Sequence, residues 1–406
     1  MDIERLGRQG DGVGAVDGVS VFVPFTLPGE QVIADVEGAR GQLLKVLASS
    51  PERIKPACPH FGTCGGCALQ HFHEEAAARW KTGQVAAALR AQRLEAPVHP
   101  VIGFAGEGRR RAVLKARRTR KSVLLGFHGR RSGQVIAIES CPVLHPEITG
   151  LLPGLGQMIA VGLTRRGEAS VHILWSLEGA DIAVEGGREV DLRLREHLGG
   201  WAAQLNLARL SWNGELIARR EIPPVLQFGK ARVTPPPGSF VQALEAAEHK
   251  MSAFVTGWLA GADHVVDLFC GCGAFSLPVA QYAPVLCVDS DLPALEALAA
   301  AAARTSRIRP VETSRRNLLN SPLRVDELER FDAAIFDPPR GGAKAQCLEL
   351  AGSRVSRVAA ISCNPVSFAR DARILVDGGF ELVEVYPIDQ FRFSPHIELA
   401  ALFRRH

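Results

Sequence analysis

In the last third of the chain, about residues 234–406, short unbroken apolar runs alternate with segments of helical period. The runs fall at 265–269, 285–288, 333–336, 358–361, 380–385 and 397–403, and an Ala/Leu-rich helix is expected over 292–304. Continuous apolar runs are typical of strands buried on both faces of a sheet. Strands that alternate with helices predict an α/β, doubly wound, Rossmann-like domain.

The first segment, residues 1–50, has no helical period. Short Val- and Ile-rich pieces at 19–23 and 31–37 are separated by turn residues such as Asp17-Gly18 and Pro28-Gly29. This pattern predicts a small β-barrel, and oligonucleotide-binding barrels are one class that fits, with a purely structural barrel as the alternative. Residues 51–233 are expected to form a mixed α/β central domain, and Pro235-Pro-Pro-Gly238 marks the linker to the domain at 234–406.

Composition narrows the class of protein. The chain has 406 residues, a net charge of +4 and nine cysteines, an odd number at low density that does not fit a secreted disulfide scaffold. The start carries no signal-peptide pattern, and the longest uncharged stretch, 268–288, is interrupted by Gly and Pro. We therefore expect a cytoplasmic monomer with no membrane partner.

A basic stretch lies between Arg109 and Arg131, with ten Lys or Arg residues and no acidic residue. Apolar residues interleave the charges, which indicates folded structure rather than a tail. Such a density of cations predicts a surface that binds the phosphates of a nucleic acid. The alternative is an ordinary solvated face.

Three cysteines, Cys58, Cys64 and Cys67, lie close together among glycines. Their spacing predicts a metal centre, either iron–sulfur or zinc, with unligated thiols as the alternative. A closed site needs a fourth ligand, and Cys141 is the candidate because the remaining five cysteines all lie beyond residue 265.

Three predicted strands end in loops that carry chemistry. They are Asp267-Leu-Phe-Cys-Gly-Cys-Gly273, Asp337-Pro-Pro-Arg340 and Ser362-Cys-Asn-Pro365. Residue 276 is Ser, so the dinucleotide fingerprint is incomplete, and the turn favours S-adenosylmethionine over a nicotinamide cofactor. Asp289, at the end of the second strand, suits a ribose diol. Cys363 is a candidate nucleophile, with a buried structural thiol as its alternative.

Together these motifs resemble the RNA 5-methyluridine methyltransferases, in particular the branch with an N-terminal TRAM barrel and a [4Fe–4S] cluster. The resemblance covers almost the whole length and implies Cys363 as nucleophile and Glu398, in His396-Ile-Glu, as general base. It implies cluster ligands at Cys58, Cys64, Cys67 and Cys141, and cofactor-binding positions at Gln242, Phe269, Ala274, Asp289, Asn317 and Asp337. Two positions depart from the family pattern: Ala274 replaces a common Asn, and Ser394-Pro395 precedes His396 in place of Thr-x.

The chemistry of carbon-5 methylation requires these residue types. A thiolate adds to carbon 6 of uracil, carbon 5 then takes the methyl group, and a base removes the carbon-5 proton so that the thiolate can leave. The expected partner is RNA, with large-subunit ribosomal RNA favoured over transfer RNA. The alternatives are an amino-methylating enzyme, a cytosine carbon-5 methyltransferase, and a non-catalytic RNA-binding protein.

Overall fold

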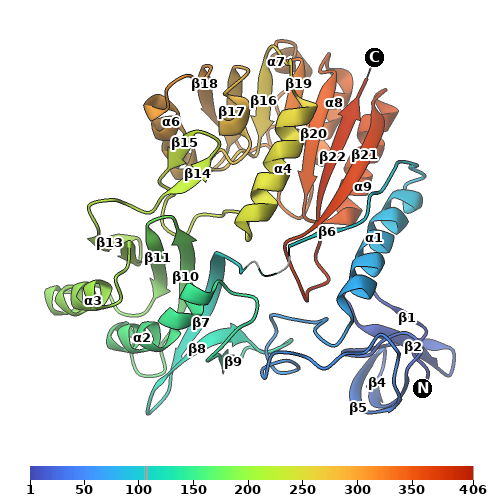
Figure 1. Cartoon of the computed structure of the whole chain (residues 1–406), viewed down its shortest axis with the longest axis vertical. Helices are drawn as coiled ribbons and strands as arrows, with labels where there is room; N and C mark the ends of the chain where they lie inside the picture. Colours follow the sequence, from blue (N-terminus) through green and yellow to red (C-terminus); the bar gives the residue numbers. More distant parts are fainter. Residues whose placement is uncertain (105, 107, 406) are drawn as a thin grey trace.

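The computed structural model describes residues 1–104, 106 and 108–405. Over these residues the chain forms three sheets of five, seven and eight strands and one separate hairpin. Figure 1 shows the eight-stranded sheet at the top, the seven-stranded sheet at the lower left and the N-terminal strands at the lower right. In the described part of the chain, no helix is both long enough and apolar enough to cross a membrane.

The N-terminal sheet has the order β1-β2-β3-β5-β4. Its strands are β1 (Arg5–Leu6), β2 (Gly12–Val16), β3 (Val19–Val23), β4 (Gln31–Glu37) and β5 (Arg40–Ala48). The predicted strands at 19–23 and 31–37 are confirmed. The free edge of β4 is covered by the chain start, because the backbones of Met1 and Val32 exchange hydrogen bonds. This closure gives the sheet its barrel-like form around Ile3, Val21 and Val23.

The seven-stranded sheet has the order β13-β12-β11-β10-β7-β8-β9, and two helices pack on it. Its elements are β7 (Arg111–Arg118), β8 (Val123–His128), β9 (Val135–Ala137), α2 (Pro146–Gly162), β10 (Glu168–Ser176), β11 (Gly179–Gly186), α3 (Leu192–Gln204), β12 (Arg209–Trp212) and β13 (Glu215–Arg219). Trp212 is fully buried in the core between helices and sheet.

The eight-stranded sheet has the order β18-β17-β16-β19-β20-β22-β21-β6. Its elements are α4 (Glu245–Trp258), β16 (Val265–Leu268), α5 (Ser276–Val279), β17 (Val285–Asp289), α6 (Leu292–Arg304), β18 (Val311–Arg315), α7 (Val325–Leu328), β19 (Ala333–Phe336), α8 (Lys344–Gly352), β20 (Arg357–Ser362), α9 (Pro365–Asp377), β21 (Glu381–Asp389) and β22 (Glu398–Arg404). The strands β18, β17, β16, β19 and β20 run parallel, while β22 is antiparallel to both β20 and β21. The predicted doubly wound fold is thus confirmed.

Alternate residues of the central strands enter two separate cores, one on each face of the sheet. Val265 and Ile335 pack with α4, α5 and α6, whereas Val266 and Phe336 pack with α7, α8 and α9. Burial on both faces explains why these strands are continuous apolar runs in the sequence. The order of the strands reverses between β16 and β19, and open α/β sheets bind their ligands at such a switch point.

Three segments upstream of residue 234 pack on the eight-stranded sheet. Helix α1 (Glu74–Ala91) lies against α9, the short strand β6 (Ile102–Gly103) pairs with β21, and the hairpin of β14 (Leu226–Phe228) and β15 (Ala231–Val233) packs on α6. Sequence patterns alone did not indicate these attachments. The domain limits at 50/51 and 233/234 stay predictions.

Candidate active site and cysteine pocket

The predicted functional loops meet at one edge of the eight-stranded sheet. Phe269, Asp289, Asp337 and Cys363 lie at or just beyond the carboxyl ends of β16, β17, β19 and β20, which are parallel. Glu398 begins the antiparallel strand β22 and therefore lies at the same edge. The fold thus brings together residues that are up to 129 positions apart in the sequence (398 minus 269).

The Gly-rich turn after β16 is tight. Phe269 has a positive φ of 64°, an unusual conformation for a residue with a side chain, and Gly273 has a φ of 90°. A Cβ at Gly273 would lie 2.8 Å from Leu298 Cδ1, so only glycine fits beside α6. The carboxylate of Asp289 accepts hydrogen bonds from the backbone N–H of Gly271 (2.9 Å) and of Asp291 (2.9 Å). Asp289 therefore holds the turn next to the switch point.

The other predicted cofactor positions lie around this turn or across from it. Ala274 is half-buried against the core beside α6, and its methyl group offers no polar atom. Asn317 follows β18, and its side chain accepts a hydrogen bond from the backbone of Leu319 (3.1 Å). Gln242 lies in the loop before α4 and donates to Asp337 (Nε2 to Oδ2, 3.0 Å). Desolvation raises the pKa of Asp337 to about 7.

Cys363 and Glu398 are neighbours across two strands. The antiparallel ladder of β20 and β22 ends with the pair of Ser362 and Leu399, and Cys363 and Glu398 are the next residues at that end of the two strands. Burial, and then the negative charge of Asp337, raise the pKa of Glu398 to about 8. Burial, and then the charge of Glu398, raise the pKa of the Cys363 thiol to about 11.

The sequence after Cys363 explains why the thiol lies at a helix start. Asn364 caps α9 by accepting a hydrogen bond from the N–H of Val366 (3.1 Å), and Pro365 occupies the first turn. The positive end of a helix favours a thiolate over a thiol. The charge of Arg340 acts in the same direction on the Cys363 pKa. Arg340 also approaches His396, with Nη2 and Nε2 3.4 Å apart.

Cys363 opens into a cleft of about 660 Å³. One wall is formed by Arg340, Cys363, His396 and neighbouring residues, and the opposite wall by α1, which contributes Lys81 and Gln84. The loop between β1 and β2 of the barrel, with Arg8 and Gln9, closes one side. A substrate that reaches the thiol therefore passes between the catalytic sheet, α1 and the barrel.

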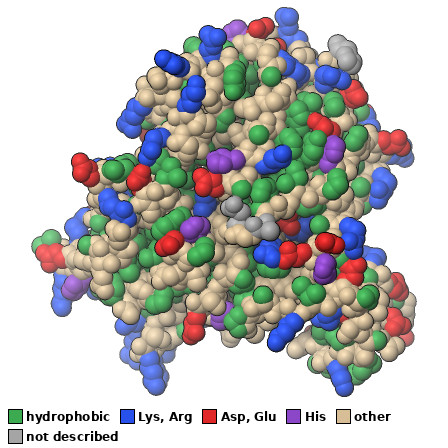
Figure 2. Space-filling model, in the orientation of Figure 1, with side chains coloured by type: hydrophobic (Ala, Val, Ile, Leu, Met, Phe, Trp, Pro, Cys, Tyr) green, Lys and Arg blue, Asp and Glu red, His purple; other side chains and the backbone are tan. Residues whose placement is uncertain are grey.

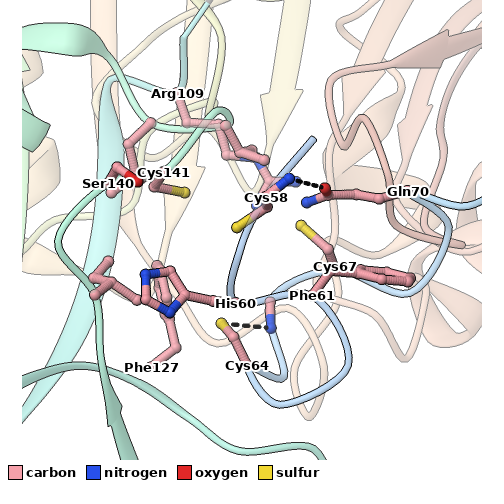
Figure 3. A pocket seen from close by; sticks show the side chains of 14 residues that line it. Cys58, His60, Phe61, Cys64, Cys67, Gln70, Arg109, Phe127, Ser140 and Cys141 are labelled. Atoms are coloured by element: carbon pink, nitrogen blue, oxygen red, sulfur yellow. Dashed lines mark hydrogen bonds between the residues drawn. The ribbon is translucent and has the colours of Figure 1, made fainter. Parts of the chain in front are cut away.

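The four cysteines of the predicted metal centre line one cavity of about 50 Å³ (Figure 3). Cys58, Cys64 and Cys67 come from the segment before α1, and Cys141 comes from the loop between β9 and α2. The N–H of Gly65 donates to the carbonyl of His128 at the end of β8 (2.9 Å), which holds the first cysteine segment against the seven-stranded sheet. Among the described residues, no three His, Cys, Asp or Glu side chains are close enough to hold a single metal ion.

The structure divides the basic stretch. Arg110 is buried and pairs with Glu248 (2.7 Å), and Arg109 points toward the cysteine cavity. Arg130 and Arg131 pair with Asp11 of the barrel. A hollow at the far end of β7 is lined by Arg118, Thr119, Arg120, Leu163 and Arg165. Figure 2 shows Lys and Arg side chains at the lower left, where Figure 1 places the ends of β7 and β8. The predicted continuous basic face is therefore reduced to this tip and a few exposed side chains.

Two buried residues near the site were missed in the sequence. Lys81 of α1 is 1% exposed, and its Nζ lies 2.6 Å from Asp389 Oδ2 at the end of β21. Gln390, also 1% exposed, bonds to Gln242 (2.7 Å). A lone Lys in an alanine-rich helix and a lone Gln after a strand gave no signal in the sequence.

The class follows from the fold and the site: the doubly wound sheet, with a Gly-rich turn and an acidic residue at its switch point, is that of a class I S-adenosylmethionine-dependent methyltransferase. Known proteins make the class more specific. The tRNA (Uracil-5-)-methyltransferase family matches residues 230–406, and the TRAM domain matches residues 1–45. An RNA methyltransferase of Caulobacter vibrioides is 42% identical over 100% of this chain and 99% of its own length. The 23S rRNA (uracil(1939)-C(5))-methyltransferase RlmD of Vibrio cholerae is 31% identical over 99% of this chain and 95% of its own length.

The chain therefore belongs to the RNA (uracil-C5) methyltransferase family and is an S-adenosylmethionine-dependent enzyme. The fold agrees with that of a Pyrococcus abyssi tRNA (uracil-54, C5)-methyltransferase solved in complex with S-adenosyl-L-homocysteine. That structure covers 99% of both chains with a TM-score of 0.76 and 20% identity. At this identity the likeness concerns the fold alone.

Proposed function

We propose that this enzyme methylates carbon 5 of a uridine in large-subunit ribosomal RNA through a covalent bond between Cys363 and uracil. The observation that carries the proposal is the end of the ladder of β20 and β22, where Cys363 and Glu398 directly follow the last pair, Ser362 and Leu399, and lie close to Asp337. A thiol and a carboxyl group on one edge are the nucleophile and base that the reaction needs. The methyl donor supplies an electrophilic methyl group when it is bound.

Residues of this chain carry out thiolate addition and proton removal. Cys363, as the thiolate, adds to carbon 6 of the uracil ring and raises the electron density on carbon 5. After methyl transfer, Glu398 removes the proton on carbon 5, and the electron pair of that C–H bond reforms the ring double bond while the thiolate leaves. The raised pKa of Glu398, about 8, suits a base that works near neutral pH. Gln242 and Asp337 lie beside this pair and are proposed to contact the cofactor, with Phe269, Ala274, Asp289 and Asn317.

The choice of ribosomal RNA rests on the relative from Vibrio cholerae, whose name gives 23S rRNA as its substrate and which matches almost the full length. Transfer RNA is the alternative, since the Pyrococcus abyssi enzyme of the same fold acts on tRNA. Cys363 lines a cleft between the catalytic sheet, α1 and the barrel, so the target base leaves its stack to reach the thiol. We assign the enzyme to the cytoplasm, as a monomer.

Cys58, Cys64, Cys67 and Cys141 are proposed to hold a [4Fe–4S] cluster, and the donor set fits such a group. A tetrahedral zinc ion needs sulfur atoms about 3.8 Å apart, because each Zn–S bond is about 2.3 Å. The thiols here are spread around a cavity, as befits a cluster in which each thiolate binds a different iron.

Buried polar atoms around this cavity support an anionic occupant. Among the described residues, Arg109 Nε and Nη2, Gln70 Nε2 and His60 Nε2 are buried without a hydrogen-bond partner, and all three residues line the cavity. Buried donors are rarely left unpaired in native proteins. A cluster with four thiolates carries net negative charge and sulfur acceptors, which would satisfy the guanidinium of Arg109 in particular. The cluster is structural or organises the RNA in this proposal, since methyl transfer is redox-neutral.

Two substitutions test the covalent mechanism. Cys363→Ala removes the nucleophile, and no methyl group should reach the RNA. Glu398→Gln permits methyl transfer but removes the base, so that a denaturant-resistant adduct of protein and methylated RNA should accumulate and carry label from the methyl donor. Cys363→Ala combined with Glu398→Gln should give no adduct. Methylated product from Cys363→Ala at the wild-type rate would refute the assignment.

The cluster is tested by metal analysis of anaerobically purified protein. We expect a brown protein with about four irons per chain. Cys141→Ser should lower the iron content. The control is Cys347→Ser, which replaces a buried thiol in α8 of the catalytic domain and should leave the iron content unchanged. A colourless protein with one zinc would contradict the proposal.

A further inference from the structure

Gln390 lies between β21 and β22, at the centre of a buried chain of hydrogen bonds that the proposed mechanism leaves unused. Its side chain is 1% exposed, and that of Gln242 is 4% exposed. The chain of bonds runs from the backbone before α4, through Gln390 and Gln242, to Asp337. The donors and acceptors around a buried amide determine where its oxygen and its nitrogen lie.

The orientation of the Gln390 amide follows from donors that cannot be reversed. Oε1 of Gln390 accepts from the backbone N–H of Ala243 (3.0 Å) and lies 3.4 Å from the N–H of Leu244. Backbone N–H groups only donate, so the atom that faces them is the oxygen. The other end of the amide is then the nitrogen, which is a donor.

This fixes Gln242 in turn. Gln390 Nε2 lies 2.7 Å from Gln242, so the atom of Gln242 that it meets is the acceptor Oε1. Gln242 therefore turns Nε2 toward Asp337 Oδ2, at 3.0 Å. Without Gln390 the amide of Gln242 could rotate by 180° and present its oxygen to the Asp337 carboxyl group.

Gln390 also lies near Glu398, because Ile388, two residues before Gln390, is paired with Glu398 in the ladder of β21 and β22. An amide nitrogen carries two hydrogens, and one is used on Gln242. A hydrogen bond from Gln390 to the Glu398 carboxylate opposes the rise in pKa that burial and the charge of Asp337 cause. One side chain thus acts both on the proposed base and on a proposed cofactor-binding residue.

We infer that Gln390 is a positioning residue that sets the orientation of the Gln242 amide and holds the Glu398 carboxylate ready to take the carbon-5 proton. This inference rests on the proposed function, because it gives Glu398 the role of base. Gln390 itself makes and breaks no bond in the reaction. It acts through its two neighbours.

The test is the pH dependence of adduct resolution in single-turnover reactions with labelled methyl donor and an RNA substrate. In Gln390→Met the hydrogen bond to the Glu398 carboxylate is lost. The ionised form of Glu398 is then less stable, so the pKa of Glu398 rises. A hydrogen bond to a charged group is worth about 1.5 kcal/mol, which corresponds to an upward shift of about one pH unit. Covalent adduct should then be visible at pH 7 and should clear as the pH rises to 9.

Gln390→Glu provides a second variant that keeps the shape of the side chain. When ionised it cannot donate to Gln242, and it places a negative charge beside Glu398, so its shift should exceed that of Gln390→Met. S-adenosylhomocysteine should bind both variants more weakly, by about threefold or more, because the Gln242 amide is no longer fixed. Since this binding is measured without RNA, it does not depend on turnover.

The matched control is Gln346→Met. Gln346 is also fully buried in the same domain, and among the described residues its amide bonds only the backbone of Leu323 (2.8 and 3.0 Å). It should lose stability to a similar degree and keep the wild-type pH profile. The inference would be overturned if wild type and Gln390→Met showed the same pH dependence of adduct resolution. It would also be overturned if Gln346→Met shifted that pH dependence as much as Gln390→Met does. Failure of the proposed function is seen separately, as product formation by Cys363→Ala.

Discussion

Glu398 is a buried carboxyl group, and its replacement by Gln should stabilise the protein increasingly as the pH rises. Glu398 is 3% exposed, and burial raises its pKa from 4.5 to about 8. The folded state therefore favours the neutral acid, while the unfolded chain ionises above about pH 4.5. The contribution of this group to stability is fully present below the unfolded pKa and is lost as the pH rises toward 8.

The magnitude follows from the two pKa values. One pH unit of difference corresponds to about 1.4 kcal/mol, and the two values differ by about 3.5 units. Between pH 5 and pH 9, the cost of keeping Glu398 neutral in the fold grows by about 4 kcal/mol. Gln has the same shape and does not titrate, so the stability of Glu398→Gln relative to wild type should rise by this amount over the same range.

Urea unfolding at pH 5, 7 and 9, followed by tryptophan fluorescence, measures the difference. Glu381→Gln serves as control, because Glu381 is exposed on β21 and should show no growing difference between the two proteins. A difference between Glu398→Gln and wild type that is the same at pH 5 and pH 9 would mean that Glu398 is not held neutral. The reasoning from burial to base strength would then be refuted, even if the variant is inactive.

Three further predictions follow from the site and the surface. Because burial raises the pKa of the Cys363 thiol even without the charge of Glu398, adduct formation in Glu398→Gln should quicken by up to about tenfold per pH unit between pH 7 and 9, and a flat rate would contradict a thiolate nucleophile. The double substitution Arg120→Glu and Lys121→Glu should weaken RNA binding and reduce its salt dependence by about two released counterions. Arg354→Glu, at an exposed position of the catalytic domain, should change neither. Filter binding at several salt concentrations measures the affinity and its salt dependence. Lys81→Met leaves Asp389 without its buried partner and should lower the free energy of unfolding by about 3 kcal/mol. Hydrogen exchange over residues 389–396 should become faster, and unchanged exchange there would contradict the prediction.

The sequence predicted best those elements whose environment is simplest. The strand at 333–336 and the helix at 292–304 agree with β19 and α6 to the residue. β19 is covered on both faces, so every position is apolar, and α6 starts at a clear cap, Asp291, whose side chain accepts a hydrogen bond from Ala294. The local sequence of such an element therefore indicates the environment in which the element lies.

Elements defined by distant contacts could not be predicted in the same way. The attachment of α1 to α9 depends on residues some 280 positions away, and nothing in the composition of α1 indicates its partner. The basic stretch was interpreted as one surface, although Arg109 and Arg110 turn inward toward the cysteine cavity and Glu248. Charge density along a sequence does not tell which face of a strand or loop each cation occupies, since alternate residues of a strand point to opposite sides.

The segment from Asp389 to His396 is where the parts of the molecule are joined. It contacts the cysteine segment, because the N–H groups of Ala68 and Leu69 lie 2.8 and 2.9 Å from the carbonyl of Phe393, and the ring of Phe391 lies 5.1 Å from the Arg109 guanidinium that lines the cysteine cavity. The same segment holds Gln390 beside Glu398 and leads directly into β22. A change at the cysteines can therefore reach the proposed base by displacing backbone, without any electron transfer. If the proposed cluster is lost, the expected consequence is a loosened loop at residues 389–396 and a misplaced base, while the Gly-rich turn on the far side of β19 keeps its geometry.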